Sequence, residues 1–333
     1  MLVQFELFYG PFSKSTLYVK FALLILIGFL AAGCNKSDTA VSLRLALDCS
    51  QNPNHIPLYV GAKLGYFKEE GIDLTIFKPT SGDALYHLES GNAELAISFL
   101  PRVLRKIVQN HKLYIVGRVI DKPLNGFLFL QETGIKTHED LNGRNVGSSW
   151  ASYNLPIFEV LLSERNIHLG SKLNIGEDLI GPLLSHKVDV VYGAMRNIHL
   201  VQIRSYGHKA QFFSVSDFGV PDYEGIIVVA RAAFRQNNKL MAKFQQALQK
   251  SIDFCLLNPK HAFELYVKDL ADKSQQNLNW QESSWYETLD LLARSQNFCP
   301  ERVKQHMQWL RDKGIICKDV NFDLAFCSIP HAE

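Results

Sequence analysis

The sequence predicts an α/β protein of two lobes with mostly parallel sheets, two hinge crossings and a helical C-terminal region. Short strand patterns alternate with helix patterns from residue 41 onward, and this alternation is typical of parallel sheets built from βαβ units. The alternation begins again after residue 130, whereas only helix patterns follow Arg231. Residues 41–333 are numerous enough to form two lobes.

The first lobe is expected to begin with a strand over 42–47, where apolar and polar residues alternate. Glycine-containing turns, such as the one at Ser90-Gly91, separate the patterns that come next. These patterns are helix 56–64, strand 72–77, helix 83–89, strand 93–98, helix 100–109 and strand 113–119.

The second lobe and the C-terminal region follow the same reasoning. We place the chain crossings at Pro123–Gly126 and at the strand after Glu224, so that lobe 1 comprises 41–124 with 225–333 and lobe 2 comprises 125–224. The expected elements of lobe 2 are strand 144–147, helix 153–164, strand 188–192 and helix 195–204. The expected C-terminal helices are 232–256, 260–271, 281–296 and 300–313.

Residues 1–33 have the pattern of a secretory signal peptide, with lysines before the apolar run 21–30 and small residues before Cys34. The run is too short for a membrane span, which needs about 20 apolar residues. Small residues directly before a cysteine resemble the lipobox of bacterial lipoproteins. We therefore predict lipid on Cys34, a tether over 34–40 and a lipid-anchored protein on the periplasmic or extracellular face of the cell envelope. Ala31 stands where an aliphatic residue is commoner, which leaves a plain cleaved signal or a short anchor helix as alternatives.

Charge and cysteine spacing exclude several classes of function. The formal net charge is +2, with 20% charged residues and no basic stripe interleaved with aromatic residues, so we expect no nucleic-acid partner. The six cysteines show no zinc-ligand spacing, and we expect neither a metal nor a cofactor. Cys317 and Cys327 are a possible disulfide pair, but buried free thiols are the preferred interpretation for most of the cysteines.

Candidate binding residues lie in the loops that follow the predicted strands. Ligands of open α/β sheets bind outside the carboxyl ends of the strands, and helix N-termini there offer unpaired N–H donors. Asn, Ser and Asp can fix a small polar ligand while aromatic rings cover its faces. Each polar residue could instead cap a helix or shape a turn, but as a set they favour binding. The candidates are Asp48, Asn54, His55, Ser98, Phe99, Ser148, Tyr153, Asn197, Tyr223 and Glu224.

Several of these segments resemble a known family. The sequence is similar to the thiamine-pyrimidine-precursor binding proteins of bacterial ABC importers, within the group that also includes sulfonate and nitrate binding proteins. The resemblance spans roughly residues 43–260. The segments that carry it are Leu45–Asp48 with Pro53–His55, Gly65–Ile72, Ala96–Ser98, Pro123–Asn125, Glu139–Gly147, Val188–Ala194, Arg196-Asn197 and Gly219–Glu224.

The resemblance implies a type 2 periplasmic-binding-protein fold, a monomer, an ABC permease as partner and a 4-aminopyrimidine ligand. Asp48 and Glu224 would accept hydrogen bonds from its amine, Asn54 and Asn197 would complete the edge, and Tyr223 or Phe99 would cover a face. On this basis Glu224→Ala should weaken binding and leave folding intact, unless Glu224 belongs to an inter-lobe salt bridge. The family commonly has an aromatic residue after the aspartate, whereas this chain has Cys49; Phe99, Trp150 and Tyr153 are candidates to compensate.

Three other functions stay open. The yeast thiamine-pyrimidine synthase shares this fold and consumes a pocket histidine and pyridoxal phosphate, with iron. Its family carries a tight cysteine-rich motif, whereas no two cysteines of this chain are closer than ten positions, so we expect no enzyme. A binding protein for a sulfonate or another small anion is the second alternative. A tethered scaffold or sensor lobe without a ligand is the third, because a fold does not fix a function.

The first testable prediction concerns the anchor. The wild-type protein should partition into the detergent phase of a Triton X-114 extract, and Cys34→Ala should abolish maturation, because only the cysteine sulfur can take the lipid. Equal partitioning of the two forms would exclude a lipoprotein.

Overall fold

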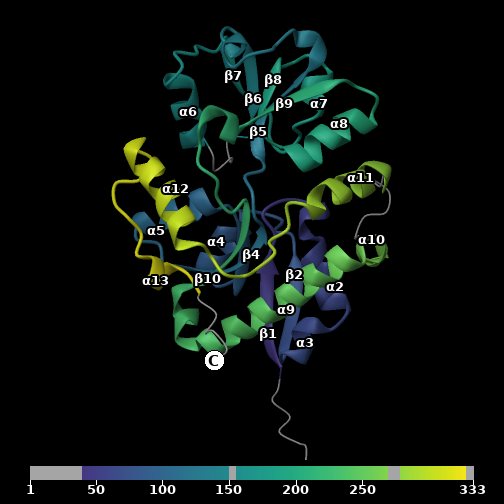
Figure 1. Ribbon diagram of the computed structural model, residues 1–333, viewed down its shortest axis with the longest axis vertical. Helices are drawn as coiled ribbons and strands as arrows, with labels where there is room; N and C mark the ends of the chain where they lie inside the picture. The colour runs from purple at the N-terminus through teal and green to yellow at the C-terminus, as the bar shows by residue number, and fades with distance from the viewer. Residues whose placement is uncertain (1–39, 150–154, 269–277, 328–333) are drawn as a thin grey trace, which may run out of the picture. The chain divides into compact units, whose positions relative to one another are not determined.

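Two five-stranded sheets organise the protein (Figure 1). The computed structural model describes residues 40–149, 155–268 and 278–327, and all of them belong to one unit that begins at Ala40. The predicted signal peptide, tether and lipidation site lie outside the described residues, as do Trp150 and Tyr153. Across the described ranges, no helix combines the length and the apolar character that a membrane crossing requires.

The sheet of the first lobe has the strand order β2-β1-β3-β10-β4. Its first strand, β1, pairs in parallel with β2 and β3, while β10 runs antiparallel to β3 and β4. The strands are β1 (Val41–Ala46), β2 (Ile72–Phe77), β3 (Leu95–Ser98), β4 (Leu113–Ile120) and β10 (Ile226–Arg231).

The sheet of the second lobe has the same plan, with the order β7-β6-β8-β5-β9. Here β6 pairs in parallel with β7 and β8, and β5 runs antiparallel to β8 and β9. The strands are β5 (Asn125–Leu130), β6 (Asn145–Ser148), β7 (Ser171–Asn174), β8 (Val190–Met195) and β9 (Ala210–Ser214).

The predicted α/β class with two sheets is confirmed, but the sheets are mixed rather than mostly parallel. In each sheet the antiparallel strand is the one that the chain forms on arriving from the other lobe: β5 in the second lobe and β10 in the first. A strand that enters from the opposite side runs against its neighbours. Strand–helix alternation along the sequence does not reveal this reversal.

Helices cover both sheets and form the C-terminal region. In the first lobe they are α2 (Ile56–Lys63), α3 (Tyr66–Glu69), α4 (Ala84–Glu89) and α5 (Leu100–Val108). The second lobe has α6 (Leu155–Ser163), α7 (Gly181–Leu184) and α8 (Val201–Ser205). The C-terminal region has α9 (Asn238–Leu257), α10 (Pro259–Lys268), α11 (Leu278–Leu289), α12 (Pro300–Asp312) and α13 (Phe322–Ala325).

The segment after α11 is not helical, whereas the sequence predicts that the helix continues to residue 296. Ala293 donates its backbone N–H to Val119 at 3.0 Å, and Leu291 accepts from Asp121 at 2.7 Å. The Gln296 side chain binds both backbone groups of Arg118, at 2.8 and 3.0 Å. This segment therefore supplies hydrogen-bond partners to backbone groups on the outer edge of β4. Its hydrogen bonds to that edge take the place of those of a helix.

The two chain crossings between the lobes lie side by side. The backbone N–H of Gly225 donates to Ile120 O at 2.9 Å. A Cβ at position 225 would stand 2.1 Å from the backbone oxygen of Lys122, so this close approach requires glycine. The domain boundaries at 124/125 and 224/225 remain predictions, but β5 begins at Asn125 and β10 at Ile226.

The five described cysteines are all free. Cys255 and Cys327 are buried, as the sequence analysis prefers, whereas Cys299 and Cys317 are exposed. Cys49 is half-buried, so two of the five described thiols are buried, and the interpretation that most of them are buried is wrong. Cys299 and Cys317 lie before and after α12.

Candidate ligand-binding site between the two sheets

A buried carboxylate lies at the end of β1. Asp48 follows this strand, and its side chain is 4% exposed. Nε2 of His55 lies 2.9 Å from its Oδ1, and the backbone N–H of Asn52 donates to Nδ1 of His55 at 3.3 Å. Because Nδ1 accepts, Nε2 carries the proton and donates it to Asp48. Both ring nitrogens of His55 are thus engaged, and the histidine fixes the orientation of the carboxylate.

The local sequence explains this arrangement. Residues Pro53–His55 form a short 3-10 helix, η1, capped by Asn52, whose side chain accepts from the backbone of Asn54 at 3.0 Å. His55 closes the reciprocal half of this capping box through its ring. The capping alternative therefore holds for His55, whose Nδ1 receives the backbone N–H of Asn52 while its Nε2 lies against Asp48.

Asp48, Cys49 and His55 form a group that has the right atoms for a metal, with ligand atoms within 4.8 Å of one another. Carboxylate, thiolate and imidazole are ligands of Zn²⁺. A metal-binding histidine, however, normally donates its other N–H to an acceptor, whereas Nδ1 of His55 faces the N–H of Asn52. In the absence of a metal, burial and secondarily Asp48 raise the pKa of the Cys49 thiol. The group fits a hydrogen-bonded carboxylate better than a metal centre.

Loops from the two lobes meet at Asn54 and Asn197. Asn54 lies in η1 of the first lobe, and Asn197 lies in η4 (Arg196–Leu200), the π-helical turn after β8. Nδ2 of Asn197 donates to Oδ1 of Asn54 at 2.7 Å, and Nδ2 of Asn54 lies 3.5 Å from the sulfur of Met195. Both asparagines are buried, at 0% and 2% exposure. The structure thus joins two predicted site residues from different sheets.

Helix α11 holds this junction from the C-terminal side. Nδ2 of Asn197 also contacts Oγ1 of Thr288 at 2.7 Å, and the hydroxyl of Ser284 donates to the backbone oxygen of Asn197. In Figure 1, α11 lies beside α8 of the second lobe. The position of the loop after β8 therefore depends on a helix that is distant in sequence.

Three further candidates also lie at strand ends. Ser98 ends β3 with 1% exposure, and its hydroxyl has no hydrogen-bond partner in the part of the chain that the structure describes. Phe99 precedes α5 and is 3% exposed. Ser148 ends β6, and its hydroxyl lies 3.4 Å from the backbone oxygen of Ser149.

Glu224 lies in an ion-pair network at the crossings and is 0% exposed. Its Oε1 accepts from Nη2 of Arg302, and Nε of Arg118 lies 3.7 Å from the same oxygen. Nη2 of Arg302 also binds Asp121 at 2.7 Å. Burial lowers the pKa of Arg118, while Glu224 opposes that shift. The salt-bridge alternative considered for Glu224 therefore describes its main contacts.

Tyr223 packs against helix α12. Its ring lies 4.5 Å from that of His306 in α12, measured between centroids, and the residue is 1% exposed. The structure hence brings together Asp48 with His55 and Asn54 with Asn197, whereas Glu224 and Tyr223 contact α12. It also adds Asn125, Met195, Thr288 and Arg302, which the sequence analysis did not select.

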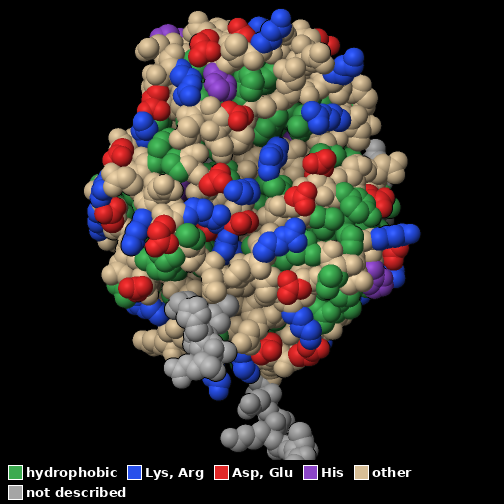
Figure 2. All heavy atoms as spheres, in the orientation of Figure 1, with side chains coloured by type: hydrophobic (Ala, Val, Ile, Leu, Met, Phe, Trp, Pro, Cys, Tyr) green, Lys and Arg blue, Asp and Glu red, His purple; other side chains and the backbone are tan. Residues whose placement is uncertain are grey.

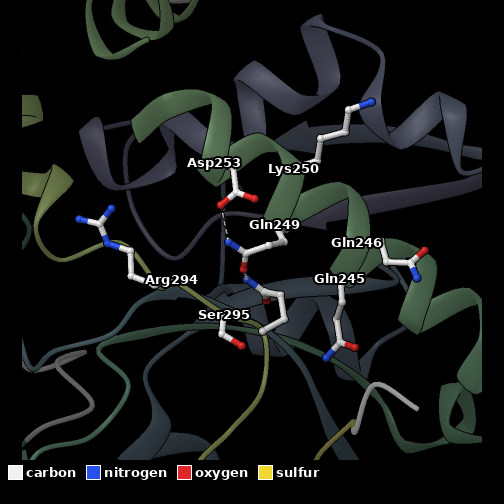
Figure 3. A pocket seen from close by; sticks show the side chains of 8 residues that line it. Gln245, Gln246, Gln249, Lys250, Asp253, Arg294 and Ser295 are labelled. Atoms are coloured by element: carbon white, nitrogen blue, oxygen red, sulfur yellow. Dashed lines mark hydrogen bonds between the residues drawn. The ribbon is translucent and has the colours of Figure 1, made fainter. Parts of the chain in front are cut away.

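The surface beyond this junction carries both signs of charge and a separate hollow. Lysine and arginine side chains alternate with acidic ones over the face in Figure 2. A hollow of about 450 Å³ lies on the first lobe between α9 and the segment after α11 (Figure 3). Gln249 donates to Asp253 there at 2.8 Å, and Gln296 donates to Gln249 at 3.3 Å. These polar groups satisfy one another.

The comparisons with known proteins show the fold and the family of this chain. Its architecture is that of a periplasmic binding protein. It is similar to the alkanesulfonate-binding protein SsuA from Xanthomonas axonopodis pv. citri bound to MOPS, with a TM-score of 0.66, 12% identity and coverage of 86% of this chain and 98% of that one. The model of the NMT1/THI5 like family matches residues 52–262, and the chain belongs to this family.

Two curated relatives are named for different functions, one for binding and one for synthesis. A formylaminopyrimidine-binding protein of Halalkalibacterium halodurans is 28% identical over 257 residues, which cover 74% of this chain and 77% of the relative. A 4-amino-5-hydroxymethyl-2-methylpyrimidine phosphate synthase of Saccharomyces cerevisiae is 22% identical over 254 residues, which cover 71% and 73%. The relatives thus include both a binding protein and an enzyme by name.

The ion pairs of Glu224 generate a stability prediction that replaces the expectation of intact folding. Glu224→Ala should lower the free energy of unfolding by about 3 kcal/mol, because it leaves the buried charges of Arg118 and Arg302 with one carboxylate fewer. Asp222→Ala is the matched control, since Asp222 pairs with Lys122 where the side chains are 42% and 46% exposed; it should cost less than about 1 kcal/mol. Urea denaturation measures both, and equal losses would show that the Glu224 network does not stabilise the fold.

Proposed function

We propose that the protein is an extracytoplasmic solute-binding protein that captures a thiamine pyrimidine precursor and delivers it to an ABC importer. The observation that carries this proposal is the contact between Asn54 and Asn197, in which polar side chains at the strand ends of two lobes meet. A ligand bound at such a junction contacts both lobes. It therefore favours the closed arrangement by population shift.

The charges near the junction support an aminopyrimidine over an anion. Asp48 presents a buried carboxylate that His55 orients, and a carboxylate accepts readily from an exocyclic amine, more strongly if the ring nitrogen is protonated. The two arginines at the crossings are already paired with Glu224 and Asp121. These carboxylates compensate the charge of the arginines, which disfavours a sulfonate or nitrate, although Nε of each arginine has no hydrogen-bond partner among the described residues.

The contacts of His55 support binding without turnover. Both of its ring nitrogens are occupied by Asp48 and Asn52, so neither is available to react. The sequence also lacks the tight cysteine-rich motif that the resemblance associates with the synthases. Since synthases are among the named relatives, the enzyme remains the alternative that the experiment below must address.

The remaining parts of the proposal concern location and partners. The signal-like segment and Cys34 support export and a lipid anchor, and a periplasmic-binding-protein fold fits delivery to a permease in the membrane. We propose a monomer, with the first lobe comprising 41–124 and 225–333 and the second lobe comprising 125–224. Ser98, Phe99, Ser148 and Tyr153 complete the proposed site.

Isothermal titration calorimetry of the mature protein tests the ligand. Formylaminopyrimidine should release heat, whereas an alkanesulfonate and nitrate should not. Asp48→Ala should weaken formylaminopyrimidine binding tenfold or more, about 1.4 kcal/mol, because the amine loses a charged acceptor. Asp73→Ala, an exposed aspartate on β2 of the same sheet, should bind like the wild type.

Two outcomes would contradict the proposal. Binding of the sulfonate without the pyrimidine would place the protein among anion-binding proteins. Formation of a pyrimidine from pyridoxal phosphate with iron, with loss of the His55 ring, would show that the protein is a synthase.

A further inference from the structure

Two buried amide oxygens at the junction of the lobes have no hydrogen-bond partner among the described residues. They are Oδ1 of Asn125 and Oδ1 of Asn197, in side chains of residues that are 5% and 2% exposed. A buried acceptor without a partner costs about 1–3 kcal/mol, and native proteins leave few of them. Two such atoms at one junction therefore need an explanation.

The other half of each amide is already committed, which fixes the direction of the free oxygen. Nδ2 of Asn125 donates to the backbone oxygen of Gly193 at 3.0 Å; a carbonyl only accepts, so the contacting atom is the amide nitrogen. Nδ2 of Asn197 is held by Asn54 and Thr288, both at 2.7 Å. In both side chains the unused atom is an acceptor.

The two asparagines belong to the same place in the fold. Asn125 is the first residue of β5, and it pairs directly with Met195 of β8. Directly paired residues of an antiparallel ladder project from the same face of the sheet, and the sulfur of Met195 lies 3.5 Å from Nδ2 of Asn54. Asn197 contacts the same Asn54. Met195 and Asn197 therefore contact one side chain of the opposite lobe, and Asn125 lies beside Met195 in the ladder.

We propose that the amide oxygens of Asn125 and Asn197 accept N–H groups of the ligand, and that Asn125 is a specificity-determining residue. This inference rests on the proposed function and adds to it the chemical class that the site selects: a planar heterocycle with an amino or amidine-type donor. An oxyanion would present oxygen to these oxygens. It would gain no hydrogen bond and would leave both acceptors buried without partners.

The buried polar atoms without a hydrogen-bond partner at the chain crossings are of both kinds, as far as the described residues show. Nε of Arg118 and Nε of Arg302 are donors. Oε2 of Glu224 is a third buried acceptor without a partner among the described residues, and the hydroxyl of Ser98 can accept or donate. Both arginines form ion pairs with the carboxylates of Asp121 and Glu224, which compensate their charge. A site built from acceptors rejects ligands that lack donors, because the loss of each hydrogen bond leaves a buried polar atom unpaired.

The binding of two ligands to the wild type and to several variants tests the role of Asn125. Calorimetry compares formylaminopyrimidine with its analogue in which hydrogen replaces the exocyclic 4-amino group, for the wild type and for Asn125→Leu. The wild type should prefer the amino compound at least tenfold, and Asn125→Leu should reduce this preference about tenfold. Asn125→Asp keeps an acceptor at this position and should keep the preference. Asn145→Leu, at an exposed asparagine whose Oδ1 already accepts from Ser171 at 2.7 Å, is the control and should leave it unchanged.

The outcomes separate this inference from the proposed function. If Asn125→Leu weakens the binding of both pyrimidines by the same factor, Asn125 does not recognise the amine and the inference is wrong.

If the wild type binds neither pyrimidine, the proposed function fails. Binding measurements with benzamidine and methanesulfonate then decide the inference. Binding of benzamidine that Asn125→Leu weakens supports the acceptor site. Binding of methanesulfonate, or of neither compound, overturns it. If Asn125→Leu does not fold, as its circular dichroism would show, loss of the amino preference in Asn125→Asp contradicts the inference.

Discussion

The arrangement of the two lobes depends on one side chain, Arg302. It reaches from α12 to Asp121 in the first crossing and to Glu224 in the second, so a single guanidinium holds both segments that connect the sheets. The glycine at 225 allows the crossings to approach, and Gln296 and Arg118 join the outer strand to the C-terminal segment. Hinge motion requires a few residues to absorb changes in the backbone dihedral angles. Here the ion pairs of Arg302, which lies in helix α12, hold the residues at the crossings in place.

The site follows from this constraint. With the crossings fixed, the loops after β1 and β8 meet. The amide nitrogen of Asn197 donates hydrogen bonds to both Asn54 and Thr288 there. Two helices of the C-terminal region thus act at different points: α12 at the crossings and α11 at the junction. At Asn125 and Asn197 the amide nitrogens are engaged within the fold, whereas the amide oxygens have no partner among the described residues. Which polar atoms of the candidate site are available to a ligand therefore depends on how the lobes are joined.

Much of the first lobe could be predicted from the sequence, because β1, β2 and β4 carry clear alternation or apolar runs between glycine turns. Strands β7 and β9 were missed, since four or five partly polar residues give too short a pattern. Strand β5 was read as a crossing, because a proline lies just before it. Asp48, Asn54 and Asn197 are candidates because of their place after strands, and their role in binding stays a prediction. The pairing of Glu224 with Arg302 could not be foreseen, as 78 residues separate them and no local pattern connects them.

Native mass spectrometry of the full-length protein, purified from the envelope without refolding, tests the central claim most directly. The account predicts a complex of the protein with one small molecule, and collisional release should yield a compound whose fragments identify an aminopyrimidine. A co-purified sulfonate or another oxyanion would contradict the account, because the acceptors at the junction of the lobes would then face a ligand without donors.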